Sequence, residues 1–277
     1  MQKFALLFFL PLFSYAQTSL KGTVCNTDKQ ALQYVNIVSL ATNNGASTNQ
    51  NGEFEITGLN KNDTLKMSEV GYEPKLMAVA ALRNTDTIFL TTRIKNLNEI
   101  KIKPFTHEQD LGFATLQDNA SFNLIPGSQL ALFIENRPKQ EGWIKGVSFR
   151  VKAKGKCSST MRVRLLYVDS LLANPSADML SENVLINSAD LKKSNYIDLR
   201  KYNLSFPPEG VFVVLEWVYT DTRCDKNSYT TIAANMAVAT NLVWLNYRDK
   251  PWHGNKKPRM ADGNYMTPDI GLKVAYR

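Results

Sequence analysis

The two histidines are the first residues to test for chemistry, because imidazole is both a common metal ligand and a common general base. His107 and His253 lie far apart in the chain. His107 stands in the run His-Glu-Gln-Asp with no second histidine at helical spacing, and no glutamate lies near His253. A catalytic zinc ion needs several converging ligands and one position open for water. The sequence therefore argues against a zinc hydrolase and predicts no cofactor.

The sequence lacks the motifs of nucleophilic catalysis, whereas two-carboxylate chemistry depends on residues that need not be close in sequence. The sequence has no Gly-x-Ser-x-Gly elbow, and Cys157 has no neighbouring histidine. The two acids of a glycosidase can lie far apart along a chain, so that chemistry stays open. Glu216 stands in an apolar run and is either a tuned acid or a structural one. Because buried acids are usually paired, we interpret Glu216 as structural, pointing outward or paired with a strand arginine such as Arg162 or Arg164.

The segment from residue 240 to residue 267 is the part of the chain most like a binding site. It combines aromatic rings with a local excess of positive charge on what we expect to be a loop, because the stretch contains glycine and proline. Aromatic rings can stack on sugars, and basic side chains can bind carboxylate or phosphate. The alternative is favoured: the rings fill the open end of a sandwich and the charges are solvated, because aromatic residues more often fill cores. The candidate ligand-binding residues are Trp244, Tyr247, Trp252, His253 and Arg259.

Strands are the elements that must position side chains in both halves of the chain. Apolar and polar residues alternate over short runs that turn signals separate, which leaves no room for a long helix. A turn is expected at residues 49–52, where Gly52 is free to take a positive φ. Closely spaced short strands of this kind predict a β-sandwich. The expected strands are 19–24, 35–40, 53–57, 64–70, 75–79, 87–91 and 98–103.

The second half shows the same alternation over longer runs. Residues 143–152 and 161–168 both alternate around a Lys-Gly-Lys turn, so we expect them to form a β-hairpin. Residues 210–219 are apolar nearly throughout, as in a central strand. Residues 180–187 fit a short helix or a strand. With further strands at 195–199 and 271–276, the sequence predicts an all-β fold of two consecutive β-sandwiches.

Four blocks of the first half resemble the carboxypeptidase-regulatory-like domain. They are Lys21–Val24, Tyr34–Ile37, Thr48-Asn49 with Asn51–Ile56, and Ser68–Glu73. The resemblance implies that residues 18–104 form a prealbumin-like β-sandwich of a type abundant in exported proteins of Bacteroidota. In zinc carboxypeptidases this domain is an accessory to a separate catalytic domain, which we do not find here. The resemblance therefore implies no peptidase activity.

Residues 105–277 are similar to the region that follows the regulatory-like domain in many small exported Bacteroidota proteins. This resemblance implies a jelly-roll-like β-sandwich and carries no function with it. The matching stretches are Ile144–Phe149, Arg162–Tyr167, Ile197–Leu204 and Gly210–Trp217.

The first 16 residues have the three parts of a secretory signal peptide. Lys3 supplies the positive start, residues 4–13 are apolar, and small residues precede a cleavage point near Ala16. The apolar run is well short of the roughly 20 residues that a spanning helix needs. We therefore expect an exported protein, in the periplasm or at the cell surface, with no transmembrane segment in the mature chain.

Export places the three cysteines in a compartment that permits disulfides. An odd number leaves at least one cysteine unpaired within the monomer. Cys157 and Cys224 both lie in the second half and are the preferred pair, although three free thiols are equally compatible with the sequence. Cys25, at the end of the first strand, is expected to act as a small buried residue.

The net charge of +8 is dispersed and forms no basic stripe, which argues against nucleic acid as a partner. The sequence thus predicts a non-enzymatic, exported cell-envelope protein that binds or scaffolds an envelope protein or a glycan. One alternative is a carbohydrate-binding protein linked to polysaccharide use, with Trp244, Tyr247 and Trp252 as the platform. A less favoured alternative is a glycosidase or an esterase.

Overall fold

The computed structural model describes residues 18–42, 44–93, 107–113, 119–218, 229–238, 240–248, 250–254 and 263–276. In these residues the chain forms two β-sandwiches, and its helices are three single 3-10 turns. The prediction of an all-β fold is confirmed. No helix in the described part of the chain is long and apolar enough to span a membrane.

The sequence predictions that lie outside the described residues include the signal peptide at residues 1–16, the strand at 98–103 and the boundary between 104 and 105. The three 3-10 turns are η1 (Val79–Ala81), η2 (Ser188–Asp190) and η3 (Arg200–Tyr202).

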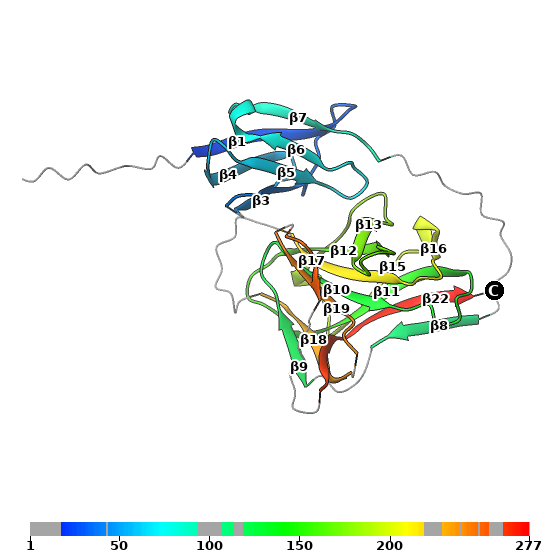
Figure 1. Cartoon of the computed structure of the whole chain (residues 1–277). Coiled ribbons are helices and arrows are strands. Elements are labelled where there is room, and N and C mark those ends of the chain that lie inside the picture. The colour runs from blue at the N-terminus through cyan, green and yellow to red at the C-terminus, as the bar shows by residue number, and fades with distance from the viewer. Residues whose placement is uncertain are drawn as a thin grey trace, which may run out of the picture.

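The smaller sandwich consists of two sheets (Figure 1). Its three-stranded sheet contains, in order, β4 (Glu53–Leu59), β1 (Thr18–Asn26) and β7 (Asp86–Leu90), with β7 parallel to β1. Its four-stranded sheet contains β3 (Gly45–Ser47), β2 (Asn36–Ser39), β5 (Thr64–Ser68) and β6 (Lys75–Ala78). Six of these strands occupy predicted runs, and the short β3 was not predicted.

Alternation along the smaller sandwich's strands builds its core, as β4 illustrates. Phe54 and Ile56 are buried, whereas Glu53 and Glu55 are exposed, because successive side chains of a strand point to opposite faces. Gly52 precedes β4 with a φ of +73°, as the turn prediction required. A Cβ there would lie 2.6 Å from the Val24 carbonyl oxygen, so the turn needs glycine for space as well.

The larger sandwich also has two sheets. Its seven-stranded sheet contains β13 (Pro175–Asp178), β12 (Thr160–Val168), β17 (Val211–Trp217), β10 (Ser128–Ile134), β19 (Val243–Tyr247) and β20 (His253–Gly254), with β14 (Val184–Asn187) also beside β12. Its eight-stranded sheet contains β21 (Tyr265–Pro268), β18 (Thr231–Val238), β11 (Gly142–Ala153), β22 (Ile270–Tyr276) and β8 (His107–Gly112), with β15 (Ser194–Asp198), β16 (Leu204–Phe206) and β9 (Ala120–Asn123) beside them.

The predicted hairpin of residues 143–152 with 161–168 is wrong. β11 pairs with β15, β16, β18 and β22, whereas β12 pairs with β13, β14 and β17 in the other sheet. Phe149 of β11 and Val163 of β12 belong to one core cluster and approach it from opposite sheets. Alternation shows which face of a strand is apolar, but it does not say which strand lies beside it.

Several segments hold strands where the sequence suggested connections. Trp244 and Tyr247 lie on β19 and not on a loop, and residues 107–112 pair with β22 as β8. Residues 184–187 form β14, so the strand alternative holds for the second half of 180–187. The predicted central strand is confirmed, since β17 lies between β12 and β10 and is buried throughout.

The two sandwiches pack against each other through the outer face of a sheet from each (Figure 1). Asn36 of β2 contacts Glu216 of β17. Val70, just after β5, packs into the hydrophobic core of the larger sandwich. Gly71 follows with a φ of +84°, and a Cβ at this position would collide with the carbonyl oxygen of Ser181. The close approach of the two backbones at this point depends on glycine.

The contact at Gly71 predicts that Gly71→Ala separates the two sandwiches. Small-angle scattering should show a larger radius of gyration, and calorimetry should show two unfolding transitions where the parent protein shows one. Gly263→Ala is the matched control, because Gly263 has nearly the same φ, +82°, with nothing within 4 Å of its Cβ position. Equal behaviour of the two variants would mean that backbone strain, and not the contact with Ser181, accounts for the effect.

Candidate functional site

A row of polar residues crosses the outer face of the seven-stranded sheet. The strand register places Arg162 of β12 opposite Glu216 of β17, Glu216 opposite Gln129 of β10, and Gln129 opposite Asn246 of β19. Directly opposed residues on one face of a sheet are near neighbours. The adjoining row holds Arg164, Val214, Ala131 and Trp244, so the outer face changes from polar to apolar within two residues.

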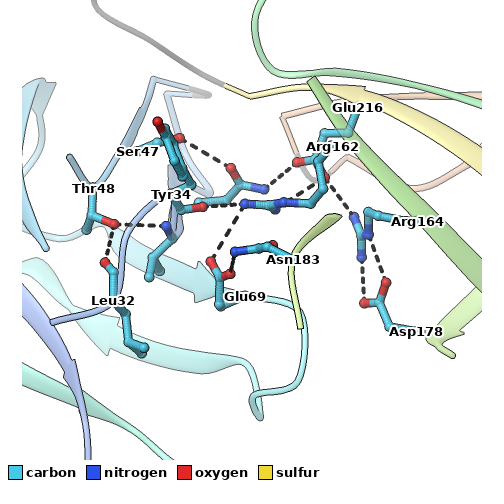
Figure 2. Close-up of polar contacts among 12 residues, drawn as sticks. Leu32, Tyr34, Ser47, Thr48, Glu69, Arg162, Arg164, Asp178, Asn183 and Glu216 are labelled. Carbon is cyan, nitrogen blue, oxygen red and sulfur yellow. Dashed lines mark hydrogen bonds and ion pairs between the residues drawn. The ribbon is translucent and has the colours of Figure 1, made fainter. Parts of the chain in front are cut away.

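Two arginines hold Glu216 at the centre of this row (Figure 2). Its Oε2 lies 3.3 Å from Arg162 Nη1 and 3.3 Å from Arg164 Nη1. The side chains of Arg162 and Glu216 are 1% and 2% exposed, so both charges are fully removed from water. Arg164 also makes a bidentate pair with Asp178, at 2.9 Å and 2.8 Å. The predicted pairing of Glu216 is confirmed, with both of the arginines that the sequence suggested.

The smaller sandwich supplies further partners of this cluster. The Nδ2 of Asn36 donates to Glu216 Oε1 at 2.5 Å, and Arg162 Nη2 donates to the Tyr34 carbonyl at 2.5 Å. Glu69 places its Oε2 3.7 Å from Arg162 Nη2. Asn183 of the larger sandwich donates to Glu69 Oε1. We call Glu69, Arg162, Arg164 and Glu216, with the groups that they bind, the interdomain cluster.

The Tyr34 carbonyl is aimed at Arg162 by a strained turn. Tyr34 has a φ of +61°, a left-handed conformation that non-glycine residues seldom adopt. Thr48 maintains it: its carbonyl accepts from Tyr34 N, and its hydroxyl accepts from Val35 N and donates to the Leu32 carbonyl (Figure 2). Strain of this kind persists only where the surroundings enforce it. Here the surroundings are a buried threonine and a buried guanidinium.

The two buried glutamates of the cluster have opposite pKa shifts. Burial alone would raise the pKa of Glu216, but Arg162, Arg164 and the Asn36 amide together hold it below its ordinary value. Burial raises the pKa of Glu69 to about 7, against the opposing effects of Arg162 and the Asn183 hydrogen bond. Glu216 has two close arginines, whereas Glu69 shares one with it at a longer distance. Glu216 is therefore ionised, and Glu69 titrates near neutral pH.

A cavity of about 380 Å³ lies beside the cluster, between the two sandwiches. Its walls include Lys66 and Arg93 from the smaller sandwich and Arg164, Lys250 and Trp252 from the larger one. The volume is within the range typical of small-molecule sites, about 300–1,000 Å³. Both polar and apolar groups are present on its surface, as is common in small-molecule sites.

The structure divides the predicted site residues among several environments. Trp244 and Trp252 are half-buried and pack on one apolar cluster with Phe212, and the Trp244 indole also donates to Asn174 Oδ1 at 2.9 Å. Of these two tryptophans, Trp252 lines the cavity. Tyr247 lies three residues after Trp244 on β19, so its ring points to the opposite face of the sheet. A single platform of Trp244, Tyr247 and Trp252 is therefore not formed.

The other predicted residues are placed as follows. His253 is exposed on β20, and Arg259 and Cys224 lie outside the described residues, so the pairing of Cys157 with Cys224 stays a prediction. Cys25 is free and buried, as expected. In the described part of the chain no group of three or more histidine, cysteine or acidic residues could hold a metal ion.

Sequence reasoning missed the half of the site that the smaller sandwich contributes. Glu69 and Asn36 stood inside blocks that resembled a known domain, but nothing in those blocks showed that they would be buried by a second sandwich. The only local signal was a pair of polar residues, Lys66 and Ser68, on the outward face of β5. Gln129 and Asn246 carried no signal, because their strands were not predicted.

Comparison with known proteins finds a family match for part of the chain. Residues 20–102 match the family model of the CarboxypepD_reg-like domain, which confirms the first resemblance for this segment. None of the curated proteins compared matches the chain. Two crystal structures of DUF3823 family proteins are similar, one from Parabacteroides merdae (10% identity, TM-score 0.21) and one from Bacteroides ovatus (8%, 0.21). Each match covers 73% of this chain, and 98% and 99% of the other chain. These scores are too low to support an inference.

The buried ion pairs predict a large loss of stability when Arg162 is removed. Arg162→Met leaves Glu216 and Glu69 buried without their nearest shared cation, and the free energy of unfolding should fall by about 3–5 kcal/mol in urea titrations. Arg200→Met is the control, because the Arg200–Asp198 pair is exposed to solvent (68% and 44%) and should contribute nothing measurable. Similar losses in both variants would contradict a special role for the buried pair.

The raised pKa of Glu69 predicts a pH dependence of stability. Folded Glu69 keeps its proton up to about pH 7, whereas its ordinary value is 4.5. The folded state is therefore favoured at low pH through this group, and the contribution is lost as the pH rises through 7. Glu216 acts in the opposite direction, since its lowered pKa contributes stability that is lost only as the pH falls below its ordinary range. The facing charges that enter both effects are those of Arg162 and Arg164.

Thermal unfolding of the parent protein and of Glu69→Gln between pH 5 and pH 8 measures this effect, at roughly unit intervals across the titration. The Tm difference between parent and variant should change across this range, with the parent losing stability relative to the variant as the pH rises. A difference that is constant with pH would show that Glu69 does not titrate in this range.

Proposed function

We propose that this protein is a non-enzymatic, exported component of the cell envelope that binds or scaffolds an envelope protein or a glycan. The observation that supports the proposal is that the protein's buried charges are paired with one another across the two sandwiches. The acid that stands out in the sequence, Glu216, accepts hydrogen bonds on both oxygens from Asn36, Arg162 and Arg164. A carboxylate with this many donors is held in one place and one ionisation state, which suits the joining of two sandwiches better than proton transfer.

Export and an envelope address rest on the signal-peptide pattern of residues 1–16. The match of residues 20–102 to the CarboxypepD_reg-like domain is consistent with them, because the resemblance is to a family abundant in exported proteins. The cluster adds a structural rationale: it fixes the relative orientation of the two sandwiches. A scaffold needs such an orientation in order to present one composite surface to a partner.

An enzyme is the second candidate, and Glu69 is the observation that favours it. A carboxyl group with a pKa of about 7 that lines a cavity has the properties of a general acid. Asp178 lines the same cavity and would be the second carboxylate of a glycosidase. Both oxygens of Asp178 are however taken by the bidentate pair with Arg164, and Glu69 Oε1 accepts from Asn183. These contacts favour a structural role for both acids.

The test combines an activity assay with a capture assay on the protein that begins at residue 17. Nitrophenyl glycosides and a nitrophenyl ester should show no turnover above buffer between pH 5 and pH 8, where Glu69 passes through its pKa. Peptidoglycan and a glycan array should retain the protein selectively. Turnover that disappears in Glu69→Gln and survives in Glu55→Gln, an exposed acid on β4, would replace the proposal with an enzyme.

A further inference from the structure

The cavity between the sandwiches has a composition that suits one class of ligand. Five of the described residues that line it are basic and two are acidic. Arg162 and Arg164 are already engaged by Glu216 and Asp178. Lys66, Arg93 and Lys250 lie outside those pairs, and Arg93 pairs instead with Glu73 (Nε to Oε1, 3.2 Å), which is not among the lining residues. The lining residues therefore carry an excess of positive charge. An excess of this sign favours an anionic ligand, and guanidinium and ammonium groups are suited to carboxylates.

Buried polar groups among the lining residues favour a ligand that also carries hydroxyl groups. Glu69, Arg162 and Asn246 line it and are each less than one-tenth exposed. Within the described part of the chain Glu69 Oε2, Arg162 Nε and Asn246 Oδ1 have no hydrogen-bond partner. Buried polar atoms are seldom left without one. These three atoms are closed to solvent in this structure, so a ligand reaches them only if the side chains around them move.

One wall of the cavity is aromatic. Trp252 is half-buried against the apolar cluster on the outer face of the seven-stranded sheet, and this contact fixes its indole beside the cavity. Because the indole is already fixed, its side chain loses little conformational entropy when the apolar face of a sugar ring stacks on it. Lys250 lies two residues earlier in the chain and lines the same cavity.

We propose that the cavity between the two sandwiches binds an acidic carbohydrate: a sugar unit that stacks on Trp252, directs its hydroxyl groups at Asn246 and Glu69, and places its carboxylate near Lys250 and Arg93. The proposal deepens the proposed function and rests on it, since it names the class of glycan that a binding module of this kind takes. It also explains why the site needs both sandwiches, because Glu69 and Arg93 come from one and Asn246, Lys250 and Trp252 from the other.

Calorimetric titration of the protein from residue 17 onward with trigalacturonic acid tests the proposal. We expect saturable binding to one site, weaker at higher salt because the carboxylate is recognised by charge. Galactotriose, which lacks the carboxylates, and triglutamate, which lacks the sugar ring, should bind much more weakly. Equal binding of galactotriose would overturn the acidic requirement, and preferential binding of triglutamate would show a peptide site instead.

Four variants locate the binding site. Trp252→Ala should weaken binding by about tenfold, and Trp252→Phe should restore most of it because a ring is present again. Lys250→Gln should weaken binding and reduce its salt dependence. Trp244→Ala is the matched control, since Trp244 packs in the same apolar cluster but is not among the residues that line the cavity. Thermal unfolding of each variant checks that the fold is retained.

The outcomes separate this inference from the proposed function. Undiminished binding in both Trp252→Ala and Lys250→Gln, or the same loss in Trp244→Ala as in Trp252→Ala, would overturn the cavity site. Absence of trigalacturonate binding would overturn the acidic-sugar assignment, while selective capture by another envelope glycan would leave the proposed function standing. Turnover of a nitrophenyl substrate would overturn the proposed function whatever binds in the cavity.

Discussion

The structure depends above all on the burial of Arg162 between two carboxylates that belong to different sandwiches. Glu216 comes from the same sheet as Arg162, whereas Glu69 and the Tyr34 carbonyl come from the smaller sandwich. Removing such charges from water costs several kcal/mol per ion, and only good geometry repays it. One relative position of the sandwiches satisfies all these contacts, so we interpret the cluster as a device that sets orientation more than one that adds stability.

The cavity is a consequence of this docking. Two outer sheet faces that both curve and twist do not fit flush everywhere, and at the cluster they are held together by side chains of fixed length. Beside it lie Trp252 and Lys250 on one side and Lys66 on the other. A cavity formed at such a junction depends on the relative position of the two sandwiches.

The sequence anticipated the fold class and part of the cluster, for reasons that particular residues show. Alternation in 161–168 placed Arg162 and Arg164 on one face, and both were named from the sequence as possible partners of Glu216. The hairpin prediction was wrong for the same segment, because alternation does not show which strands pair. The aromatic platform failed because Trp244 and Tyr247 are separated by an odd number of positions on β19, which was expected to be a loop.

The sequence by itself determined the period-two faces of the strands, the glycine turn at Gly52 and the class of partner that Glu216 needs, because these depend on neighbours along the chain. Only the tertiary structure decided which strands pair and what lies across the interface. The Arg162–Tyr34 and Asn36–Glu216 contacts join residues 128 and 180 positions apart. Contacts between residues so far apart in the sequence form where the two sandwiches pack against each other, and no local sequence pattern predicts them.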